Sequence, residues 1–317
     1  MMAAYCSELH TNDLEPYSCA AAECFLKQPT IEQEKRVVAH LTTMNELTVF
    51  IPGIICDMYA PQDTNNLQPD ERCFFTRENA LRVDTWRKYV EEHVEDDVKP
   101  WCLIPILIQM SIRANSMGHF KSFVKKKDNI RIGSFDAVGK RTTDPMKLIV
   151  PVFNPSKCDV TCHNDDAVSL ISRFSTKEAK KPFDLIYLDP PYTASVEYAA
   201  FYFLHNVVLS NVRPTNFNKV TGLPKYRVKS AFNSKDAVKA MKTLIEGCVA
   251  SSMVTLVSYN DEGIIKAEEW RRILEPYDAK LLERDYKRYG SNRGVEAEGS
   301  RTEVKEQLYV IRAKKSV

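Results

Sequence analysis

The residues best suited to chemistry lie between Phe183 and Tyr192, where the chain reads Phe-Asp-Leu-Ile-Tyr-Leu-Asp-Pro-Pro-Tyr. The apolar part of this stretch has the length and composition of a buried β-strand. The strand must end at Asp189, because the prolines that follow have no N–H to donate to a sheet ladder. The sequence therefore places a carboxylate at the carboxyl end of a buried strand, where open α/β sheets bind their ligands.

An acid followed by a rigidly held carbonyl suits the activation of an aromatic amine. Such an amine is a poor nucleophile, since its lone pair is delocalised into the ring. The carboxylate of Asp189 and the carbonyl of Pro190 could accept its two hydrogens, while Pro190 and Pro191 hold that carbonyl in a fixed orientation. Tyr192 could stack on the base. The plainer interpretation is a strand that ends in a proline-rich turn with a solvated acid.

Two further predicted strands also end in acids. Asp13 follows Asn12 at the end of one, in the position where nucleotide-binding α/β folds hold a pair of ribose hydroxyls. Asp166 follows the other and could accept from the exocyclic amine of a bound adenine, with Asp165 or Asn164 capping the next helix. The alternative for each acid is a helix N-cap or a turn.

The order of the predicted elements indicates an α/β fold with a doubly wound sheet, because strands alternate with helices from residue 158 onwards. Residues 50–75 are expected to be irregular, and residues 126–157 to form strands and loops. Helices are expected over 16–26, 32–47, 78–95, 101–125, 166–174, 198–209, 235–249 and 268–274, and strands over 7–13, 160–163, 185–188, 253–259, 280–286 and 307–313.

Composition excludes several classes of protein. The hydrophobic content of 44% is ordinary for a globular chain, and no run of roughly 18 apolar residues predicts a membrane span. The nine cysteines are scattered without Cys-x-x-Cys pairs, which favours a reducing compartment over a disulfide framework. Zinc is not expected, because Cys158 and Cys162 would lie about 13 Å apart on a strand, and no fourth ligand stands beside them and His163.

The formal charge of +2 is nearly neutral, so a nucleic-acid surface must come from local clusters. Basic residues do cluster in three predicted loops, where they could bind phosphates, with the aromatic residues between them stacking on unpaired bases. A solvated surface is the alternative. The clusters are Lys121, Lys125, Lys126, Lys127, Arg131, Lys140 and Arg141; Arg213, Lys219, Lys225, Arg227 and Lys229; and Arg284, Lys287, Arg288 and Arg293.

Taken together, these motifs resemble the adenine-N6 DNA methyltransferases of the alpha (Dam-like) class, in the branch that contains the FokI and NlaIII methylases. Asp189-Pro190-Pro191-Tyr192 is similar to the catalytic motif of that family. Asn12-Asp13 is similar to its ribose-binding segment, and Asp166-Ala167 to its cofactor-adenine segment. Further similar segments are Phe75-Thr76-Arg77-Glu78-Asn79, residues 113–119, residues 258–263 and Tyr286-Lys287-Arg288-Tyr289.

The resemblance implies a Rossmann-like methyltransferase fold, a doubly wound α/β sheet with an inserted, mainly helical target-recognition region. Residues 1–59 would form a partial cofactor-binding half, 60–150 the recognition region and 151–317 the catalytic half. It implies S-adenosylmethionine as cofactor, positioned by Asp13, Asp166 and Asp189, and an intracellular, cytoplasmic protein associated with double-stranded DNA. A companion restriction endonuclease is the further partner implied. The residues expected to contact DNA are Lys125, Lys126, Lys127, Arg131, Lys287 and Arg288.

Two departures from the family pattern bear on function. Ser195, Val196 and Glu197 stand where relatives often carry an arginine after the catalytic tyrosine. The glycine-rich cofactor loop, which in the family precedes the Asn-Asp segment, is missing, and no two glycines of the chain are closer than four positions. An N-terminally shortened methyltransferase is therefore expected. The alternatives are a methyltransferase acting on RNA or another amine, and a non-catalytic DNA-binding remnant.

Overall fold

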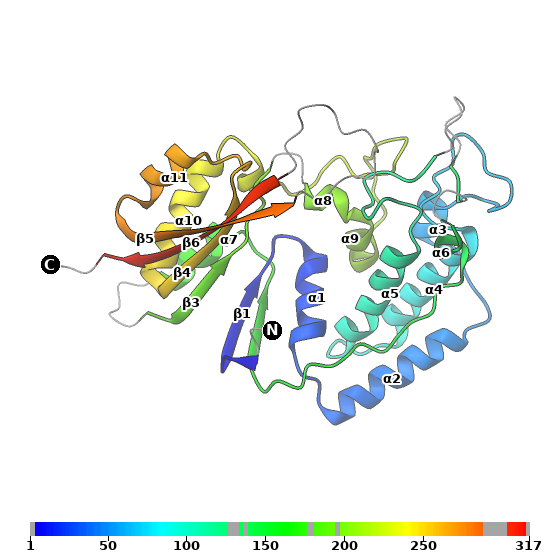
Figure 1. Ribbon diagram of the computed structural model, residues 1–317. Coiled ribbons are helices and arrows are strands. Elements are labelled where there is room, and N and C mark those ends of the chain that lie inside the picture. Colours follow the sequence, from blue (N-terminus) through cyan, green and yellow to red (C-terminus); the bar gives the residue numbers. More distant parts are fainter. Residues whose placement is uncertain are drawn as a thin grey trace. The chain divides into compact units, whose positions relative to one another are not determined.

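The computed structural model describes residues 4–125, 133–135, 139–175, 181–193, 197–287 and 303–314. The chain forms two compact units, each built from two separate segments (Figure 1). Unit 1 consists of Met1–Asn164 and Tyr198–Val228, and unit 2 of Asp165–Glu197 and Lys229–Val317. No helix within the described ranges is long and apolar enough to cross a membrane.

Unit 1 is mainly helical, with a pair of strands. Its helices surround a core rich in aromatic residues, in which Trp86, Tyr59 and Phe74 are almost completely buried. Its elements are β1 (Glu8–Asn12), α1 (Pro16–Leu26), α2 (Ile31–Glu46), α3 (Ile54–Tyr59), α4 (Arg77–His93), α5 (Lys99–Arg113), α6 (Lys140–Thr143), β2 (Asp159–His163), α8 (Tyr198–Phe201) and α9 (Phe203–Ser210).

Polar side chains fix where the long helices of unit 1 begin. Thr30 and Gln33 form a reciprocal capping box at the start of α2, in which each side chain accepts a hydrogen bond from the other's backbone N–H. Thr76 caps α4 by accepting from the N–H of Asn79 at 3.2 Å. These bonds satisfy N–H groups that the first turn of a helix leaves without partners.

Unit 2 is built around a sheet of four strands in the order β3-β4-β6-β5, in which β3 and β4 are parallel and the other pairs antiparallel (Figure 1). Its elements are α7 (Ala167–Phe174), β3 (Phe183–Leu188), the 3-10 helix η3 (Ala231–Asn233), α10 (Ala237–Ser251), β4 (Ser252–Asn260), α11 (Ala267–Leu274), β5 (Tyr277–Lys287) and β6 (Glu303–Ala313).

The two faces of this sheet differ. On one face Val257, Tyr259 and Ile311 are buried with apolar side chains of α7, α10 and α11. On the other face, which carries the alternate residues of the strands, Leu185 is 38% exposed and Tyr187 54% exposed. The helices of unit 2 therefore cover one side of its sheet.

The strands lie in two sheets, whereas the sequence predicted one doubly wound sheet. In unit 1, β1 pairs with β2 in parallel, in register from Glu8 opposite Asp159 to Asn12 opposite His163. Within the described ranges, no strand pairs with the second edge of β1 or with the second edge of β3. The α/β character of the prediction is confirmed.

One predicted helix is too long. The helix expected over residues 101–125 ends at Arg113, because Asn115 turns back onto the segment before α4. The Asn115 N–H donates to the carbonyl of Phe74 at 2.8 Å, and its fully buried side chain donates to that of Cys73 at 2.9 Å. The expectation of an irregular 50–75 also missed the short α3.

Candidate active site

Strand β3 ends directly before Asp189 as the sequence predicted, but the expectation that this strand is buried was wrong: among the described strands it lies at the edge of the sheet, and Leu185 and Tyr187 are exposed. The strand pairs in parallel with β4, its last residue Leu188 lies opposite Val257, and Asp189 follows before the buried Pro190. The side chain of Asp189 reaches solvent, yet enough protein surrounds it that partial burial raises its pKa. No donor among the described residues lies within hydrogen-bonding distance of this carboxylate. Its oxygens are therefore available to a ligand.

The segment after Asp189 is fixed by bonds to other parts of unit 2. The carbonyl of Tyr192 accepts from the N–H of Ile264 at 2.9 Å, and the carbonyl of Thr193 accepts from the side chain of Asn233 at 2.6 Å. The ring of Tyr192 meets that of Tyr259 edge to face at 5.7 Å. The catalytic tetrapeptide predicted from the sequence is therefore contiguous and anchored at its tyrosine end.

Tyr259, on which Tyr192 rests, is itself held firmly. Its hydroxyl accepts from the N–H of Ile265 at 3.1 Å, and its ring packs against Trp270 at 5.2 Å. Gly263 lies so close to the Tyr259 ring that any side chain there would collide with it. The turn that follows β4 thus closes on Tyr259 and provides a rigid support for Tyr192.

The sequence analysis missed a second carboxylate at this end of the sheet. Glu306 of β6 lies opposite Asn260 of β4. Burial, then Asp189, then Asp261 raise the pKa of Glu306, so Asp189 and Glu306 share one electrostatic environment. The signal that could have found Glu306 is the pairing of the 307–313 strand with the 253–259 strand, because it brings the residues just before 307 to the Asp189 end of the sheet.

Asp166 has a role that the sequence analysis gave to its neighbours. Its carboxylate accepts from the N–H of Ser169 at 3.0 Å and so caps α7, whereas Asp165 or Asn164 had been expected to do this. Asp165 instead pairs with Arg173 at 2.6 Å, and the side chain of Asn164 donates to the carbonyl of Asp13. The expected cap was wrong by one or two residues, because Asp166 is the residue that immediately precedes α7.

Asp13 lies in unit 1, directly after β1. Its N–H donates to the carbonyl of His163 at 3.2 Å, which extends the pairing of the two strands by one step. One carboxylate oxygen accepts from the N–H of Glu15 at 2.9 Å and stabilises the turn into α1. Asp13 and Asp166 each keep a second oxygen that is unused among the described residues.

Most of the predicted DNA contacts lie outside the described residues, namely Lys126, Lys127, Arg131 and Arg288. Lys125 is described: it forms an isolated antiparallel bridge with Gly133, and its ammonium lies 5.0 Å from the centre of the Phe123 ring. Lys287 is the last residue of β5.

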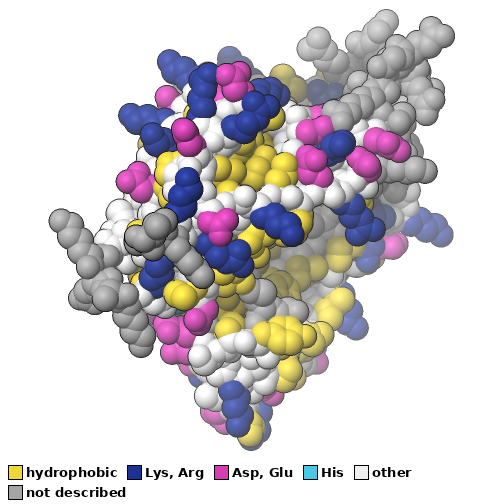
Figure 2. Space-filling model, turned by 60° about the vertical axis from the view of Figure 1, so that its left-hand side comes forward, with side chains coloured by type: hydrophobic (Ala, Val, Ile, Leu, Met, Phe, Trp, Pro, Cys, Tyr) yellow, Lys and Arg dark blue, Asp and Glu magenta, His cyan; other side chains and the backbone are white. Residues whose placement is uncertain are grey.

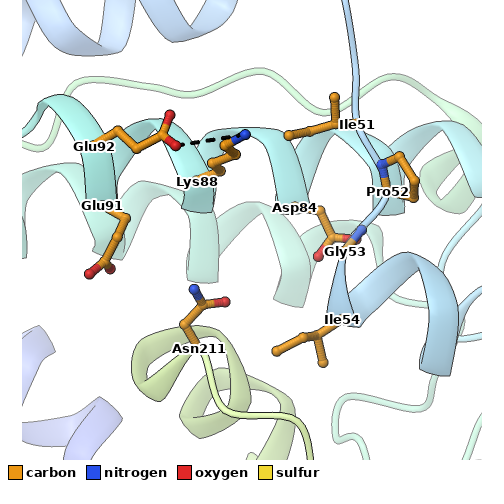
Figure 3. Close-up of a pocket in the computed structure, with 9 residues that line it drawn as sticks. All are labelled: Ile51, Pro52, Gly53, Ile54, Asp84, Lys88, Glu91, Glu92 and Asn211. Atoms are coloured by element: carbon orange, nitrogen blue, oxygen red, sulfur yellow. Dashed lines mark hydrogen bonds and ion pairs between the residues drawn. The ribbon is translucent and has the colours of Figure 1, made fainter.

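A pocket in unit 1 also contains a carboxylate, of a different character (Figure 3). Asp84 points at the start of α3 and accepts from the N–H groups of its N-cap Gly53 and of Ile55 and Cys56 in its first turn, at 2.7 to 2.9 Å. Burial raises its pKa to about 6, although these donors favour the ionised form. Lys88 on the pocket wall pairs with Glu92. Asp84 thus holds the N-terminal turn of α3, and it was not among the predicted site residues.

Three relatives match this chain over most of its length. It is 25% identical over 310 residues to "Type II methyltransferase M.CviAII" of Paramecium bursaria Chlorella virus 1, across 96% of this chain and 83% of that protein. It is 26% identical over 247 residues to "Type II methyltransferase M.NlaIII" of Neisseria lactamica, across 76% and 67%. It is 28% identical over 261 residues to "Type II methyltransferase M.FokI" of Planomicrobium okeanokoites, across 78% of this chain but 36% of that protein.

These matches make the chain a relative of type II methyltransferases, and the expected similarity to the FokI and NlaIII methylases is found. A Rossmann-like fold, which such relatives imply, agrees with the α/β architecture of the structure. No protein-family model matches the chain. No solved structure matches it significantly either.

Proposed function

We propose that this protein is a site-specific DNA methyltransferase that transfers a methyl group from S-adenosylmethionine to the N6 amine of adenine. The observation that carries the proposal is the Asp189 carboxylate at the carboxyl end of β3, unengaged among the described residues and followed by Pro190 and an anchored Tyr192. The relatives named type II methyltransferases supply the reaction class.

In this proposal the residues of unit 2 act on the amine. Asp189 and the Pro190 carbonyl accept its two hydrogens, which localises the nitrogen lone pair for attack. Tyr192, supported by Tyr259, stacks on the base once it has left the duplex, as base-modifying enzymes require. The cofactor supplies the electrophilic methyl: a nitrogen–carbon bond forms, a sulfur–carbon bond breaks, and the displaced proton leaves through Asp189 or water.

Asp13 and Asp166 fit the cofactor role only in part. Each has one carboxylate oxygen bound to a backbone N–H and one that remains available as an acceptor for a hydroxyl or an amine. The glycine-rich loop that would approach the cofactor closely has no counterpart in the printed sequence. We therefore expect this chain to bind S-adenosylmethionine weakly in titration calorimetry, and more tightly when a glycine-rich strand and loop are added. Tight binding without any addition would contradict this part of the proposal.

The predicted basic residues would hold the DNA. Lys125, Lys126, Lys127 and Arg131 lie within the proposed recognition region at 60–150. Lys287 is the last residue of β5, and Arg288 is next in the sequence. Their role is to neutralise phosphates, which sets the position of the duplex without reading its sequence. A companion restriction endonuclease belongs to the same proposal.

Methyl transfer from labelled S-adenosylmethionine to plasmid DNA tests the function, with the glycine-rich segment added if binding requires it. Digestion of the product to nucleosides and mass spectrometry should show N6-methyladenine, and an RNA of matched composition should remain unlabelled. Label on RNA alone, or on another amine, would identify the first rival function. The protein with the added glycine-rich segment is here called the completed protein. If it bound DNA without transferring a methyl group, the second rival function, a non-catalytic DNA-binding remnant, would be identified.

A further inference from the structure

Unit 1 carries a small β-hairpin, here called the 216–225 hairpin, that the sequence analysis treated as a basic loop. The N–H of Lys225 donates to the carbonyl of Asn216 at 2.9 Å, and the N–H of Asn218 donates to that of Leu223 at 2.8 Å. Phe217 and Pro224 form the antiparallel bridge between these bonds. The segment therefore has a defined backbone conformation.

The turn of the hairpin is fixed by its own sequence. The side-chain oxygen of Asn218 accepts from the N–H groups of Val220 and Thr221 at 2.8 and 3.0 Å. Gly222 closes the turn with a φ of +71°, which favours glycine. Its N–H donates back to the carbonyl of Asn218 at 2.8 Å. The turn is thus held without help from a ligand.

Two residues of unit 1, the core residue Tyr59 and the half-buried Arg72, fasten the hairpin at its tip. The hydroxyl of the buried Tyr59 donates to the carbonyl of Gly222 at 3.0 Å. Arg72 donates to the carbonyls of Lys219 and Met58 at 2.8 and 3.0 Å, and its guanidinium lies 5.1 Å from the centre of the Phe217 ring. Burial lowers the pKa of Arg72, and its two terminal nitrogens donate to these backbone carbonyls. The hairpin therefore has a fixed orientation on unit 1.

The hairpin and the residues beside it present cations together with exposed apolar side chains. Lys219 and Lys225 are exposed, Tyr226 is 91% exposed and Val220 is 48% exposed. Over the face shown in Figure 2, Lys and Arg side chains alternate with Asp and Glu. From residue 198 to residue 235, in contrast, the sequence contains no Asp or Glu. A chain with a net charge of only +2 thus concentrates positive charge here.

We propose that the 216–225 hairpin, with Tyr226, is a DNA-contacting element that binds the target duplex through Lys219 and Lys225. This inference rests on the proposed function. It extends the DNA contact from the six residues of the expected set to the second basic cluster, which the sequence left open as either a phosphate site or a solvated surface. A two-stranded ribbon fits the major groove. A segment without acidic residues complements phosphate, and a rigid hairpin loses little entropy on binding. The exposed Tyr226 ring provides an apolar contact to sugar or base.

The test is direct binding of the whole chain to a fluorescent duplex, measured by anisotropy over a range of salt concentrations. The double variant Lys219→Ala/Lys225→Ala should lower the log–log salt slope by about 1.8, which is about 0.9 for each lost phosphate contact. Lys35→Ala/Lys88→Ala, which removes two exposed lysines from α2 and α4 of the same unit, should leave the slope unchanged. Equal slopes for the two double variants would overturn the proposal.

A second pair of variants tests the aromatic contact without changing charge. Tyr226→Ala should weaken DNA binding about tenfold, within the range measured for aromatic contacts to bases, whereas Tyr226→Phe should bind like the parent. Circular dichroism melting should show no loss of fold, because Tyr226 is almost entirely exposed. Parent-like binding by Tyr226→Ala would exclude the aromatic contact.

The experiment separates failure of the hairpin from failure of the proposed function, because binding needs no methyl transfer. Variants that bind DNA like the parent, in a protein that methylates adenine, would overturn the hairpin alone. If the variants lost DNA binding and the parent protein methylated no DNA, the DNA contact of the hairpin would be supported and the methyltransferase proposal would be refuted. Poly-glutamate serves as a probe for an acidic protein partner. If it bound through Lys219 and Lys225 while DNA did not bind, the partner would be an acidic protein and the inference would be overturned.

Discussion

Two carboxylates of this protein, Asp84 in unit 1 and Asp189 in unit 2, have pKa values raised by burial but opposite surroundings. Asp84 accepts from three backbone N–H groups and holds the N-terminal turn of α3 in place. Asp189 stands at the end of a strand, with no donor within reach among the described residues. A raised pKa alone would place both acids in an active site.

The difference shows that hydrogen-bonding capacity distinguishes the two acids better than burial does. A carboxylate has several acceptor positions, and those of Asp84 are already used by the backbone. Those of Asp189 remain for an outside donor, such as an amine with two hydrogens. The acid that the fold itself needs should therefore affect stability when it is removed, and the acid that the fold leaves unused should affect reaction rate.

The largest expected effect follows from Asp189→Ala. Losing a group that acts mainly in the transition state typically costs about 3–4 kcal/mol, or a few hundredfold in rate. The rate of methyl transfer by the completed protein should fall accordingly, while the melting temperature and DNA affinity stay close to those of the parent. Near-normal turnover by this variant would exclude the proposed role of Asp189.

Asp84→Ala should show the opposite behaviour. The change leaves three backbone N–H groups without their acceptor, so we expect a loss of about 3 kcal/mol in the free energy of unfolding. Urea denaturation followed by tryptophan fluorescence measures it, and Asp84→Asn, which keeps one acceptor, should lose less. If the folded Asp84→Ala protein lost rate as severely as Asp189→Ala, the comparison would fail.

The pH dependence of kcat/KM sharpens the contrast at Asp189. Asp189 accepts from the amine only when ionised, and a raised pKa means that it becomes protonated at a higher pH than an ordinary aspartate. The rate should therefore fall about tenfold for each pH unit below that pKa, starting above pH ~4. If kcat/KM fell only at the pH where an ordinary aspartate becomes protonated, the raised pKa of Asp189 would be contradicted.

A smaller effect is expected at Asp166, which combines both kinds of behaviour. Asp166→Ala removes the N-cap of α7 and should lower the stability of the protein by about 1 kcal/mol. Asp166→Ser can restore the cap but lacks the second carboxylate oxygen proposed for the cofactor. Stability of Asp166→Ser near the parent value, combined with weaker S-adenosylmethionine binding in the completed protein, would separate the two roles. Parent-like cofactor binding by Asp166→Ser would limit Asp166 to capping.

Local chemistry explains the parts of this protein that could be predicted from sequence. The strand before Asp189 and its end are set by an apolar run and two prolines, so both were predicted within two residues. The helix at 16–26 was predicted at its observed bounds, with Pro16 at its first position, where a missing N–H costs nothing. These features depend on residues close together in the chain.

The features that were missed depend on pairings across the chain. Glu306 reaches the Asp189 end of the sheet through its pairing with Asn260, 46 positions earlier. The 101–125 helix ends early because Asn115 bonds to Cys73 and Phe74. The orientation of the 216–225 hairpin on unit 1 depends on Tyr59 and Arg72, which bond to its turn. No local sequence pattern at Asn115 or Gly222 predicts these distant partners.

The aromatic support beneath Tyr192 gives unit 2 a built-in optical reporter. Tyr192 contacts Tyr259, Tyr259 contacts Trp270, and Trp270 stacks on Tyr309 at 4.3 Å. The other two tryptophans, Trp86 and Trp101, belong to the core of unit 1. Replacing both with phenylalanine would leave Trp270 as the single source of indole emission. Its intensity and wavelength would then follow the arrival of a base or cofactor beside Tyr192 in real time, without a label on either ligand.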